Sequence, residues 1–353
     1  MSLHHCLLVF IASLFAYVQA APFQKRAFSN GPVIAENFPD PGFIEVENGF
    51  YAFATTSGGR NVPTAYSTDF ASWAVIDQDA LPVLPSWGTA PIWAPDVIQR
   101  VSLPSPAARA YTEHSLQPDG VFVLYYTALS KQDANRHCVG TATANEVAGP
   151  YTPTADPLAC PLAEGGAIDP AGFIDTDGTI YAVYKIDSNS LGGGGACGNG
   201  NLARDTPIML QQLASDGITP VGSPTKILSR SQYDGPLIEA PSLMRSEDGT
   251  YVVFFSSNCF NGPYYDVSYA TAPAVGGPYT KSPKPLLVSG DNRGTLNSPG
   301  GADVGQDGKR LVFHADREPA NAGVRQMWTV DIYVQGGVVY LIAPPAAASV
   351  DTS

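Results

Sequence analysis

Five segments of this chain share one pattern: an apolar stretch, an Asn-Gly or Asp-Gly turn, and a second stretch rich in aromatic and β-branched residues. An Asn-Gly or Asp-Gly pair between two such stretches predicts a tight hairpin of adjacent antiparallel strands. The turn glycines of the five predicted hairpins are Gly49, Gly120, Gly178, Gly249 and Gly308. Each repeating unit therefore contributes at least two neighbouring strands of one sheet.

A second internal repeat gives the period. The segments ATANEVAGPYT, from Ala142, and ATAPAVGGPYT, from Ala270, agree at eight of eleven positions and begin 128 residues apart. If one unit lies between them, the period is about 64 residues, and five units account for roughly 327 residues. Five four-stranded sheets around an axis form a five-bladed β-propeller, whereas a β-sandwich would explain the strands but not the period. We expect an all-β fold, with residues 27–353 as one domain and the glycine-rich stretch 191–200 as a rim loop.

The first residues have the features of an export signal. An apolar run ends at small residues before Ala20, which predicts a signal peptide over residues 1–20 and a secreted, extracellular protein. Lys25 and Arg26 are either a dibasic processing site, which would make residues 21–26 a propeptide, or an ordinary exposed basic pair. No later segment approaches the twenty consecutive apolar residues of a membrane-spanning helix.

The charge of the chain excludes several kinds of partner. The net charge is −13, from 19 Lys and Arg against 32 Asp and Glu. Nucleic acids and anionic membranes are bound by clustered basic residues, so neither is an expected partner. A neutral substrate is the better expectation, and we expect a monomer.

Four cysteines remain after removal of the predicted signal peptide. An even number in an exported chain favours two disulfides, for which four cysteines allow three connectivities. Their wide spacing, without a C-x-x-C pair, disfavours a zinc site. We prefer Cys138 with Cys160 and Cys197 with Cys259, because each pair links neighbouring parts of the repeat.

Acidic residues recur at one position of the repeat. Asp40 lies eight residues before the turn residue Asn48, Asp169 lies eight before its own turn, and Glu239 lies nine before its own, each with a proline close behind. Equivalent positions of propeller blades converge on the central axis, so we expect these three carboxylates to be neighbours. A lone Asp-Pro is usually only a turn, but three like charges brought together are tolerated mainly where they serve a function.

The other two units differ at this position. Asp96, in PIWAPDVIQ, is the candidate from the second unit, and the fifth unit has Gly300 and Gly301 at about the same place. With these motifs, including the W-A-P-D segment, the mature chain resembles glycoside hydrolase family 43, a family of arabinofuranosidases, arabinanases and β-xylosidases. The resemblance implies that Asp40 is the general base, Asp169 the residue that tunes pKa and orientation, and Glu239 the general acid of an inverting hydrolysis. Inversion requires the base and the acid to lie about 6.5–9.5 Å apart, with water between base and sugar.

Further residues are candidate substrate contacts. Aromatic side chains near the acids can stack on a sugar or fill the core. The resemblance also points to an arginine that reaches the substrate and to a histidine near the axis. The candidates are Phe38, Trp93, Asp96, Phe173, His314 and Arg325.

The resemblance allows a central calcium beside His314, but we do not expect one. Gly300-Gly301-Ala302-Asp303 stands where many members of the family have Gly-His. We assign no metal ligands, and the predicted reaction requires no cofactor.

The predicted activity is that of an inverting α-L-arabinofuranosidase or arabinanase acting on arabinose-containing plant cell-wall polysaccharide. A β-xylosidase acting on xylo-oligosaccharides is the alternative enzyme, because pocket loops decide between these sugars on one scaffold. A non-catalytic sugar-binding propeller is the alternative of another class, and retention of all three acids argues against it.

Overall fold

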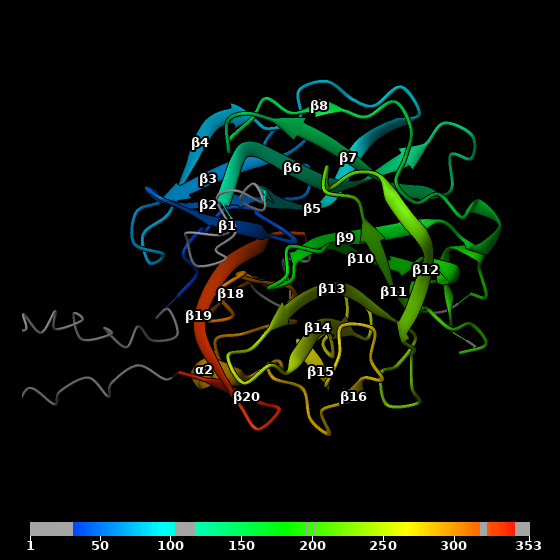
Figure 1. The fold of residues 1–353 in the computed structure, drawn as a ribbon. Helices are drawn as coiled ribbons and strands as arrows, with labels where there is room; N and C mark the ends of the chain where they lie inside the picture. Colours follow the sequence, from blue (N-terminus) through cyan, green and yellow to red (C-terminus); the bar gives the residue numbers. More distant parts are fainter. Residues whose placement is uncertain (1–30, 103–116, 195, 201, 318–322, 343–353) are drawn as a thin grey trace, which may run out of the picture.

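The structure is a computed structural model that describes residues 31–102, 117–194, 196–200, 202–317 and 323–342. Its strands form five four-stranded antiparallel sheets that follow one another around a central axis (Figure 1). The expected five-bladed β-propeller is confirmed. Each blade consists of four strands that are consecutive in the chain.

In every blade the four strands follow one another in chain order from the axis outward. Blade 1 contains β1 (Gly42–Val46), β2 (Gly49–Phe53), β3 (Pro63–Ser67) and β4 (Ala74–Asp79). Blade 2 contains β5 (Gly88–Ser102), β6 (Gln117–Ser130), β7 (His137–Ala144) and β8 (Thr152–Pro153). Blade 3 contains β9 (Ala167–Ile174), β10 (Ile180–Ile186), β11 (Ile208–Leu213) and β12 (Pro220–Leu228).

Blade 4 contains β13 (Ile238–Arg245), β14 (Tyr251–Ser257), β15 (Ser268–Ala272) and β16 (Thr280–Lys281). Blade 5 contains β17 (Gly300–Val304), β18 (Arg310–Asp316), β19 (Arg325–Gln335) and β20 (Val338–Leu341). Short helical turns lie in the connections: η1 (Leu162–Glu164), η2 (Ser188–Leu191), η3 (Ala196–Gly198) and α2 (Asp291–Gly294).

Four of the five predicted hairpin turns lie where the glycines placed them. Gly178, Gly249 and Gly308 have φ of 86°, 86° and 67°, the left-handed conformation in which glycine has no steric penalty. The fifth prediction is wrong, because Gly120 lies within β6. Ser102 pairs with Gln117, so the connection between β5 and β6 falls at residues 103–116, outside the described residues.

The hydrophobic core lies between blades rather than in one central mass. Strand β14 is buried along its whole length. Its Val252 and Phe254 pack with blade 5, and its Val253 and Phe255 pack with blade 3. Successive side chains of a strand point to opposite faces, so both faces of a blade must be apolar where it lies between two others. The same kind of cluster joins each of the other neighbouring pairs of blades.

The ring closes where blade 5 meets blade 1. Backbone hydrogen bonds join Val33 and Ile34 to Met327 of β19, and Phe38 N–H donates to the Arg325 carbonyl. Phe38 is 1% exposed, within a cluster shared by the two blades. The segment before β1 therefore fastens the first blade to the last.

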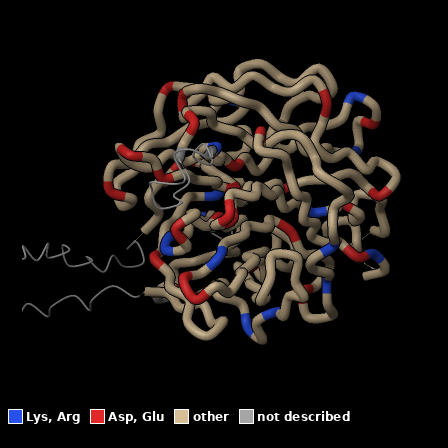
Figure 2. The backbone as a smooth tube through the Cα atoms, viewed as in Figure 1, with Lys and Arg blue, Asp and Glu red and all other residues tan. Residues whose placement is uncertain are grey.

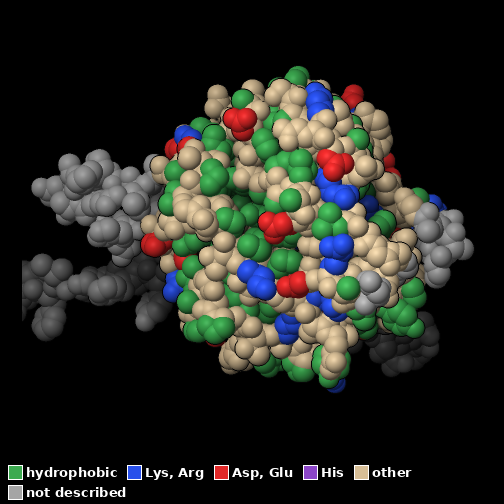
Figure 3. Space-filling view, turned by 90° about the vertical axis from the view of Figure 1, so that its right-hand side faces the viewer, with side chains coloured by type: hydrophobic (Ala, Val, Ile, Leu, Met, Phe, Trp, Pro, Cys, Tyr) green, Lys and Arg blue, Asp and Glu red, His purple; other side chains and the backbone are tan. Residues whose placement is uncertain are grey.

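Both predicted disulfides are present, Cys138 with Cys160 and Cys197 with Cys259. The predicted signal peptide (1–20) and propeptide (21–26) lie outside the described residues. Among the residues that the structure describes, no helix has the length and apolarity needed to cross a membrane. Lys and Arg are scattered between more numerous acidic positions (Figure 2), and they form no continuous basic surface on the face shown in Figure 3.

Candidate active site

One residue in the inner strand region of every blade adopts a left-handed conformation. We call these five residues the bulge positions, because the pairing of inner and second strands shifts or ends beside them. They are Asp40, Ala94, Asp169, Ala240 and Gly301, with φ between 38° and 55°. All five line a cavity of about 30 Å³ on the axis. Each blade therefore turns its backbone toward the axis in the same way.

This alignment corrects the register taken from the sequence. Glu239 precedes the bulge position Ala240, so its equivalent in blade 2 is Trp93, which precedes Ala94. Asp96 lies two residues after the bulge position, where blade 5 has Asp303. Asp40 and Asp169 are equivalent to each other, as predicted, and Glu239 reaches the same region from the preceding position.

Four of the five bulge positions donate their backbone N–H to a polar side chain of the preceding blade. That side chain lies near the end of the second strand. The N–H of Asp40 donates to His314 Nδ1 at 3.1 Å, and the N–H of Asp169 donates to Thr127 Oγ1 at 3.0 Å. Ala94 and Gly301 donate in the same way to Thr55 and Ser256. We call the residues at this place in the five blades the acceptor positions; they are Thr55, Thr127, Lys185, Ser256 and His314.

Blade 3 breaks this pattern, because its acceptor position is Lys185, whose ammonium group can only donate. The Ala240 N–H donates instead to Asp169 Oδ2 at 3.0 Å. Lys185 Nζ lies 3.0 Å from Glu239 Oε2 and 3.1 Å from Asp187 Oδ1. Because Lys185 stands at the acceptor position of blade 3, the Ala240 N–H of blade 4 bonds to Asp169 instead. Lys185 also places a buried positive charge beside Glu239.

The three predicted catalytic acids line one larger cavity of about 380 Å³. This volume is within the range of about 300–1,000 Å³ that small-molecule sites occupy. We call this cavity the pocket. Its lining includes Asp40, Trp93, Asp169, Lys185, Cys197, Glu239, Phe260, Tyr265 and Arg325. The repeat has therefore brought together residues from all five blades.

The Asp40 carboxylate has two side-chain donors. Arg325 Nη1 lies 2.6 Å from Oδ1, and the Thr55 hydroxyl donates to Oδ2 at 2.7 Å. Burial, the largest single influence, raises the pKa of Asp40, but the charge of Arg325, the charge interaction with His314 and the hydrogen bonds from Thr55 and Arg325 together lower it below its usual value. Burial, followed by the charge of Arg325, lowers the pKa of His314 to about 3, so the imidazole is neutral and can accept the Asp40 amide. Asp40 is held as an ionised group.

Asp169 and Glu239 have different surroundings. Lys185 and the Tyr265 hydroxyl each donate to one oxygen of Glu239, the latter at 2.9 Å. Burial, followed by the charge of Glu239, raises the pKa of Asp169 to about 8. Asp169 therefore retains a proton at neutral pH, while the ammonium group of Lys185 pairs with Glu239.

Three of the other predicted substrate contacts, Trp93, Arg325 and His314, lie in or next to the pocket. Arg325 and Trp93 line the pocket, and Trp93 stacks on His137 with ring centroids 3.8 Å apart. His314 is fully buried, in contact with Asp40.

The remaining three candidates, Phe38, Phe173 and Asp96, do not line the pocket. Phe38 and Phe173 are 1% and 2% exposed and belong to the hydrophobic clusters between blades, so neither can stack on a sugar. Asp96 lines the small axial cavity and is not in the lining of the pocket.

Two carboxylates form the far end of the axial cavity. Asp96 Oδ2 accepts the Gly172 N–H of the next blade at 2.6 Å. Asp303 Oδ2 accepts the Phe43 N–H at 2.8 Å, and this bond joins blade 5 to blade 1. Burial raises the pKa of both carboxyl groups, that of Asp303 to about 6. These acids hold neighbouring blades together.

Sequence reasoning missed the acceptor positions, although a signal was present. Each lies six or seven residues after a turn glycine, as the polar residue that follows the aromatic and β-branched run. Lys185 is conspicuous as the cation at the end of IYAVYK. Tyr265 has no such signal, because it lies in the irregular connection between β14 and β15.

Side chains suited to a metal ion do not gather in the described part of the chain. No group of three or more His, Cys, Asp or Glu there could hold an ion. His314 Nε2 is buried without a hydrogen-bond partner, but calcium takes six to eight oxygen ligands. The side chains around His314 do not fit such an ion, and we derive no step through one.

Comparison with known proteins agrees with this geometry. Over 250 residues the chain is 25% identical to a β-D-galactofuranosidase of Aspergillus niger, a match that covers 65% of this chain and 62% of that protein. Over 177 residues it is 27% identical to an extracellular endo-α-(1→5)-L-arabinanase of Thermotoga petrophila, covering 41% and 33%. The chain thus spans less than two thirds of the length of these curated relatives.

Solved structures show the same fold. A thermostable family-43 glycoside hydrolase superimposes with a TM-score of 0.73 at 24% identity, covering 91% of this chain and 97% of the other. An arabinanase of Bacillus subtilis gives 0.62 at 21% identity, covering 89% and 99%. The family model described as glycosyl hydrolases family 43 matches residues 29–335, which include all five inner strands and every residue that we place in the pocket. The chain belongs to glycosyl hydrolases family 43, a family of inverting glycoside hydrolases.

Proposed function

We propose that this protein is an inverting α-L-arabinofuranosidase or arabinanase that acts on arabinose-containing plant cell-wall polysaccharide. The observation that supports it best is the convergence of Asp40, Asp169 and Glu239 on one pocket, where Asp40 and Glu239 have different charged partners and Asp169 accepts a backbone amide. A protein that only binds sugar does not need an ionised Asp40 beside a protonated acid pair, Asp169 and Glu239, whereas acid–base catalysis needs both.

In this proposal Asp40 is the general base. Its lowered pKa keeps it ionised, and Arg325 and Thr55 fix the orientation of its carboxylate. A water molecule bound to Asp40 attacks the anomeric carbon from the face opposite the leaving group, and Asp40 takes its proton. Asp40 comes from blade 1 and Glu239 from blade 4, so the width of the pocket can hold sugar and water between them.

Glu239 is the general acid. The leaving oxygen needs a proton, and the buried Asp169–Glu239 pair holds one up to about pH 8. When a glycosidic oxygen occupies the pocket beside Glu239, the proton has to pass from Asp169 to Glu239 and then to that oxygen. Asp169 therefore acts as the proton reservoir and positioning residue of the acid.

The choice of arabinose is supported by the relatives. A pentose linked through its O5, as in the α-(1→5)-arabinan named for the Thermotoga relative, must be a furanose, because O5 is the ring oxygen of the pyranose. The Aspergillus relative is named for another furanoside, a galactofuranoside. β-Xylosidase activity is the second candidate, since a Humicola insolens relative, 29% identical over 99 residues, is named a xylosidase/arabinosidase.

We also propose that the protein is secreted as a monomer after removal of residues 1–20. The support is the apolar N-terminal run, the two disulfides and the extracellular arabinanase among the relatives. N-terminal sequencing of the secreted protein would identify the cut, including any processing after Arg26.

Substrate and stereochemistry can be tested together. The purified protein is incubated with nitrophenyl α-L-arabinofuranoside, nitrophenyl β-D-xyloside and nitrophenyl β-D-galactofuranoside, and the first product is observed by proton NMR before mutarotation. We expect the arabinofuranoside to be cleaved fastest and the β anomer of arabinose to appear first. Preferential cleavage of the xyloside would replace the sugar assignment, and a first product of retained configuration would overturn the mechanism.

A further inference from the structure

A series of contacts links the loops around the pocket from blade 2 to blade 5, and we call these linked loops the wall. Trp93 of blade 2 stacks on His137, and the neighbouring Arg136 donates from Nη1 to the Ser190 carbonyl of blade 3 at 2.9 Å. Asn189 Nδ2, in the same blade 3 connection, donates to the Cys197 carbonyl at 3.0 Å. The wall therefore continues from blade 2 to the tip of the long connection between β10 and β11.

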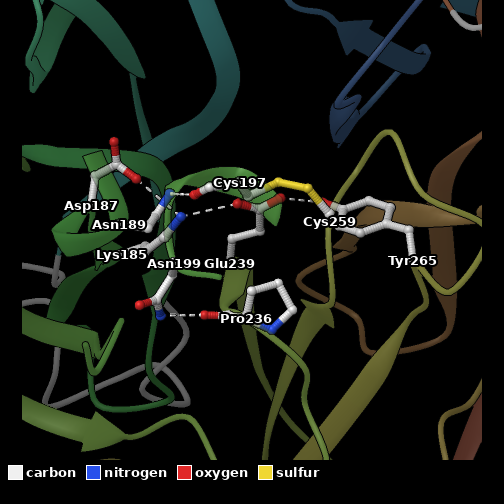
Figure 4. Close-up of a disulfide and its surroundings, with 9 residues drawn as sticks. All are labelled: Lys185, Asp187, Asn189, Cys197, Asn199, Pro236, Glu239, Cys259 and Tyr265. Atoms are coloured by element: carbon white, nitrogen blue, oxygen red, sulfur yellow. Dashed lines mark hydrogen bonds and ion pairs between the residues drawn. A yellow bond between two sulfur atoms is a disulfide. The ribbon is translucent and has the colours of Figure 1, made fainter. Parts of the chain in front are cut away.

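The disulfide continues this wall from blade 3 to blade 4. Cys197 lines the pocket together with Glu239, and it is bonded to Cys259 in the connection between β14 and β15 (Figure 4). The same connection carries Tyr265, which donates to Glu239. The disulfide thus joins two loops that stand over the acid.

Phe260, which follows Cys259 in the chain, carries the wall to blade 5. Its ring lies over the guanidinium of Arg325, 5.3 Å from Cζ to centroid. Arg325 in turn pairs with Asp40. The disulfide consequently holds a loop whose next residue packs on the partner of the general base.

The base of the blade 3 connection is fastened separately. Asn199 is fully buried, and its Nδ2 donates to the carbonyls of Pro236, at 2.6 Å, and Arg204, at 3.1 Å. Figure 4 shows this link beside the disulfide. Loss of the disulfide should therefore loosen the tip of the connection over the pocket and leave its base attached to blade 4.

We propose that the Cys197–Cys259 disulfide is a specificity-determining element that makes the pocket accessible from one side only, for a sugar at the end of a chain. A polysaccharide that crosses the site needs openings on two opposite sides of the pocket. Among the described residues, the linked contacts run from blade 2 to blade 5, so we place the open side at blade 1, where Asp40 and Thr55 line the pocket. The enzyme accordingly releases single terminal sugars. This inference rests on the proposed glycosidase activity but not on the identity of the sugar.

The first test is the size of the products released by the native protein. Linear arabinan and linear xylan are digested separately, and early products are separated by anion-exchange chromatography. Monosaccharide alone, from whichever polymer is cleaved, is the expected result. A ladder of oligosaccharides at early times would overturn the inference and leave the activity standing. Monosaccharide from xylan but not from arabinan would support the inference while refuting the proposed arabinose specificity.

The second test removes the disulfide. In Cys197→Ser/Cys259→Ser we expect KM for the nitrophenyl glycoside to rise about tenfold. We also expect kcat to stay within about threefold, because Asp40, Asp169 and Glu239 keep their strand positions. Short oligosaccharides should now appear among the polymer products. The matched control is Cys138→Ser/Cys160→Ser, which removes a disulfide whose cysteines do not line the pocket.

A third variant distinguishes an effect on the pocket wall from a general loss of stability. Phe260→Ala leaves both disulfides intact and removes the part of the wall that covers Arg325, so its KM should rise as well, without loss of thermal stability. If both Cys197→Ser/Cys259→Ser and Phe260→Ala fold and keep the native KM and the native products, the disulfide does not determine specificity. Equal effects of the two disulfide removals would refute the assignment in the same way.

Discussion

The pocket and the axial cavity beneath it are both lined by carboxylates, but they use these groups in different ways. In the pocket, the partners of Asp40 and Glu239 are side-chain donors, Arg325 and Lys185 among them. In the axial cavity, Asp96 and Asp303 accept backbone amides of the next blade. A backbone amide cannot leave its carboxylate without moving a strand. The comparison predicts that acids of the pocket govern turnover and acids of the axial cavity govern stability.

The largest effect should come from replacing the base or the acid. Asp40→Asn and Glu239→Gln each remove one proton-transfer group without changing side-chain size, so each should lower kcat by about 10²–10⁴-fold. Thermal unfolding should stay close to that of the native protein. Retention of more than about a tenth of native kcat by either folded variant would contradict its catalytic role.

Tyr265→Phe should have the next largest effect. It removes the hydroxyl that donates to Glu239 and keeps the ring that packs beside Gly300. A hydrogen bond to a charged group contributes about 1.5–3 kcal/mol, so kcat/KM should fall roughly 10–100-fold. The matched control is Tyr251→Phe in the same blade, whose hydroxyl donates to Asp175 outside the pocket. Equal losses of activity in the two variants would show that Tyr265 has no special role.

Asp303→Ala tests the other side of the comparison. It leaves the Phe43 N–H and the Ser242 hydroxyl without their acceptor, at the junction of blade 5 with its neighbours. We expect the free energy of unfolding to fall by about 1–3 kcal/mol, measured by denaturant titration. Turnover by the folded protein should change little. Glu247→Ala, at an 85% exposed side chain, serves as the control. Unchanged stability together with a large loss of turnover would reverse the assignment.

The smallest effect concerns pH. The proton of the Asp169–Glu239 pair is lost as pH rises through about 8, so native kcat/KM should fall on that alkaline side. Asp169→Asn removes the like charge that helps to retain the proton, so the alkaline fall should begin roughly one pH unit or more lower, with a reduced maximum. A pH profile of kcat/KM for the two proteins decides the point. An alkaline limb that does not move would rule out Asp169 as the tuning residue.

Much of the fold could be predicted because its signals are local. The turn glycines and the repeated GPYT segments report hairpins and a period without any knowledge of tertiary contacts. The one wrong turn, at Gly120, arises because Asp-Gly also suits an irregular position inside a strand. Asp119 Oδ1 accepts the Val121 N–H there, while the pairing of β5 with β6 shifts nearby.

The site was only partly predictable, because register and burial depend on the assembled ring. Counting back from a turn cannot detect the shift at each bulge position, so Asp96 was aligned with Asp40 although Ala94 is its equivalent. The aromatic ring of Phe173 suits a sugar or a neighbouring blade equally well, and only the packing of blades 3 and 4 decides between them. Lys185 was overlooked because a lysine in a sequence is read as exposed until its partners are known.

The five bulge positions are places where one substitution could change the chemistry of the site. Each holds its backbone in a conformation that costs a non-glycine residue about 1–2 kcal/mol, and each faces the axis whatever its side chain. Two of them carry carboxylates today, two carry alanine and one carries glycine. A single codon change at Ala94 or Ala240 would add a functional group at the catalytic centre without altering any strand pairing.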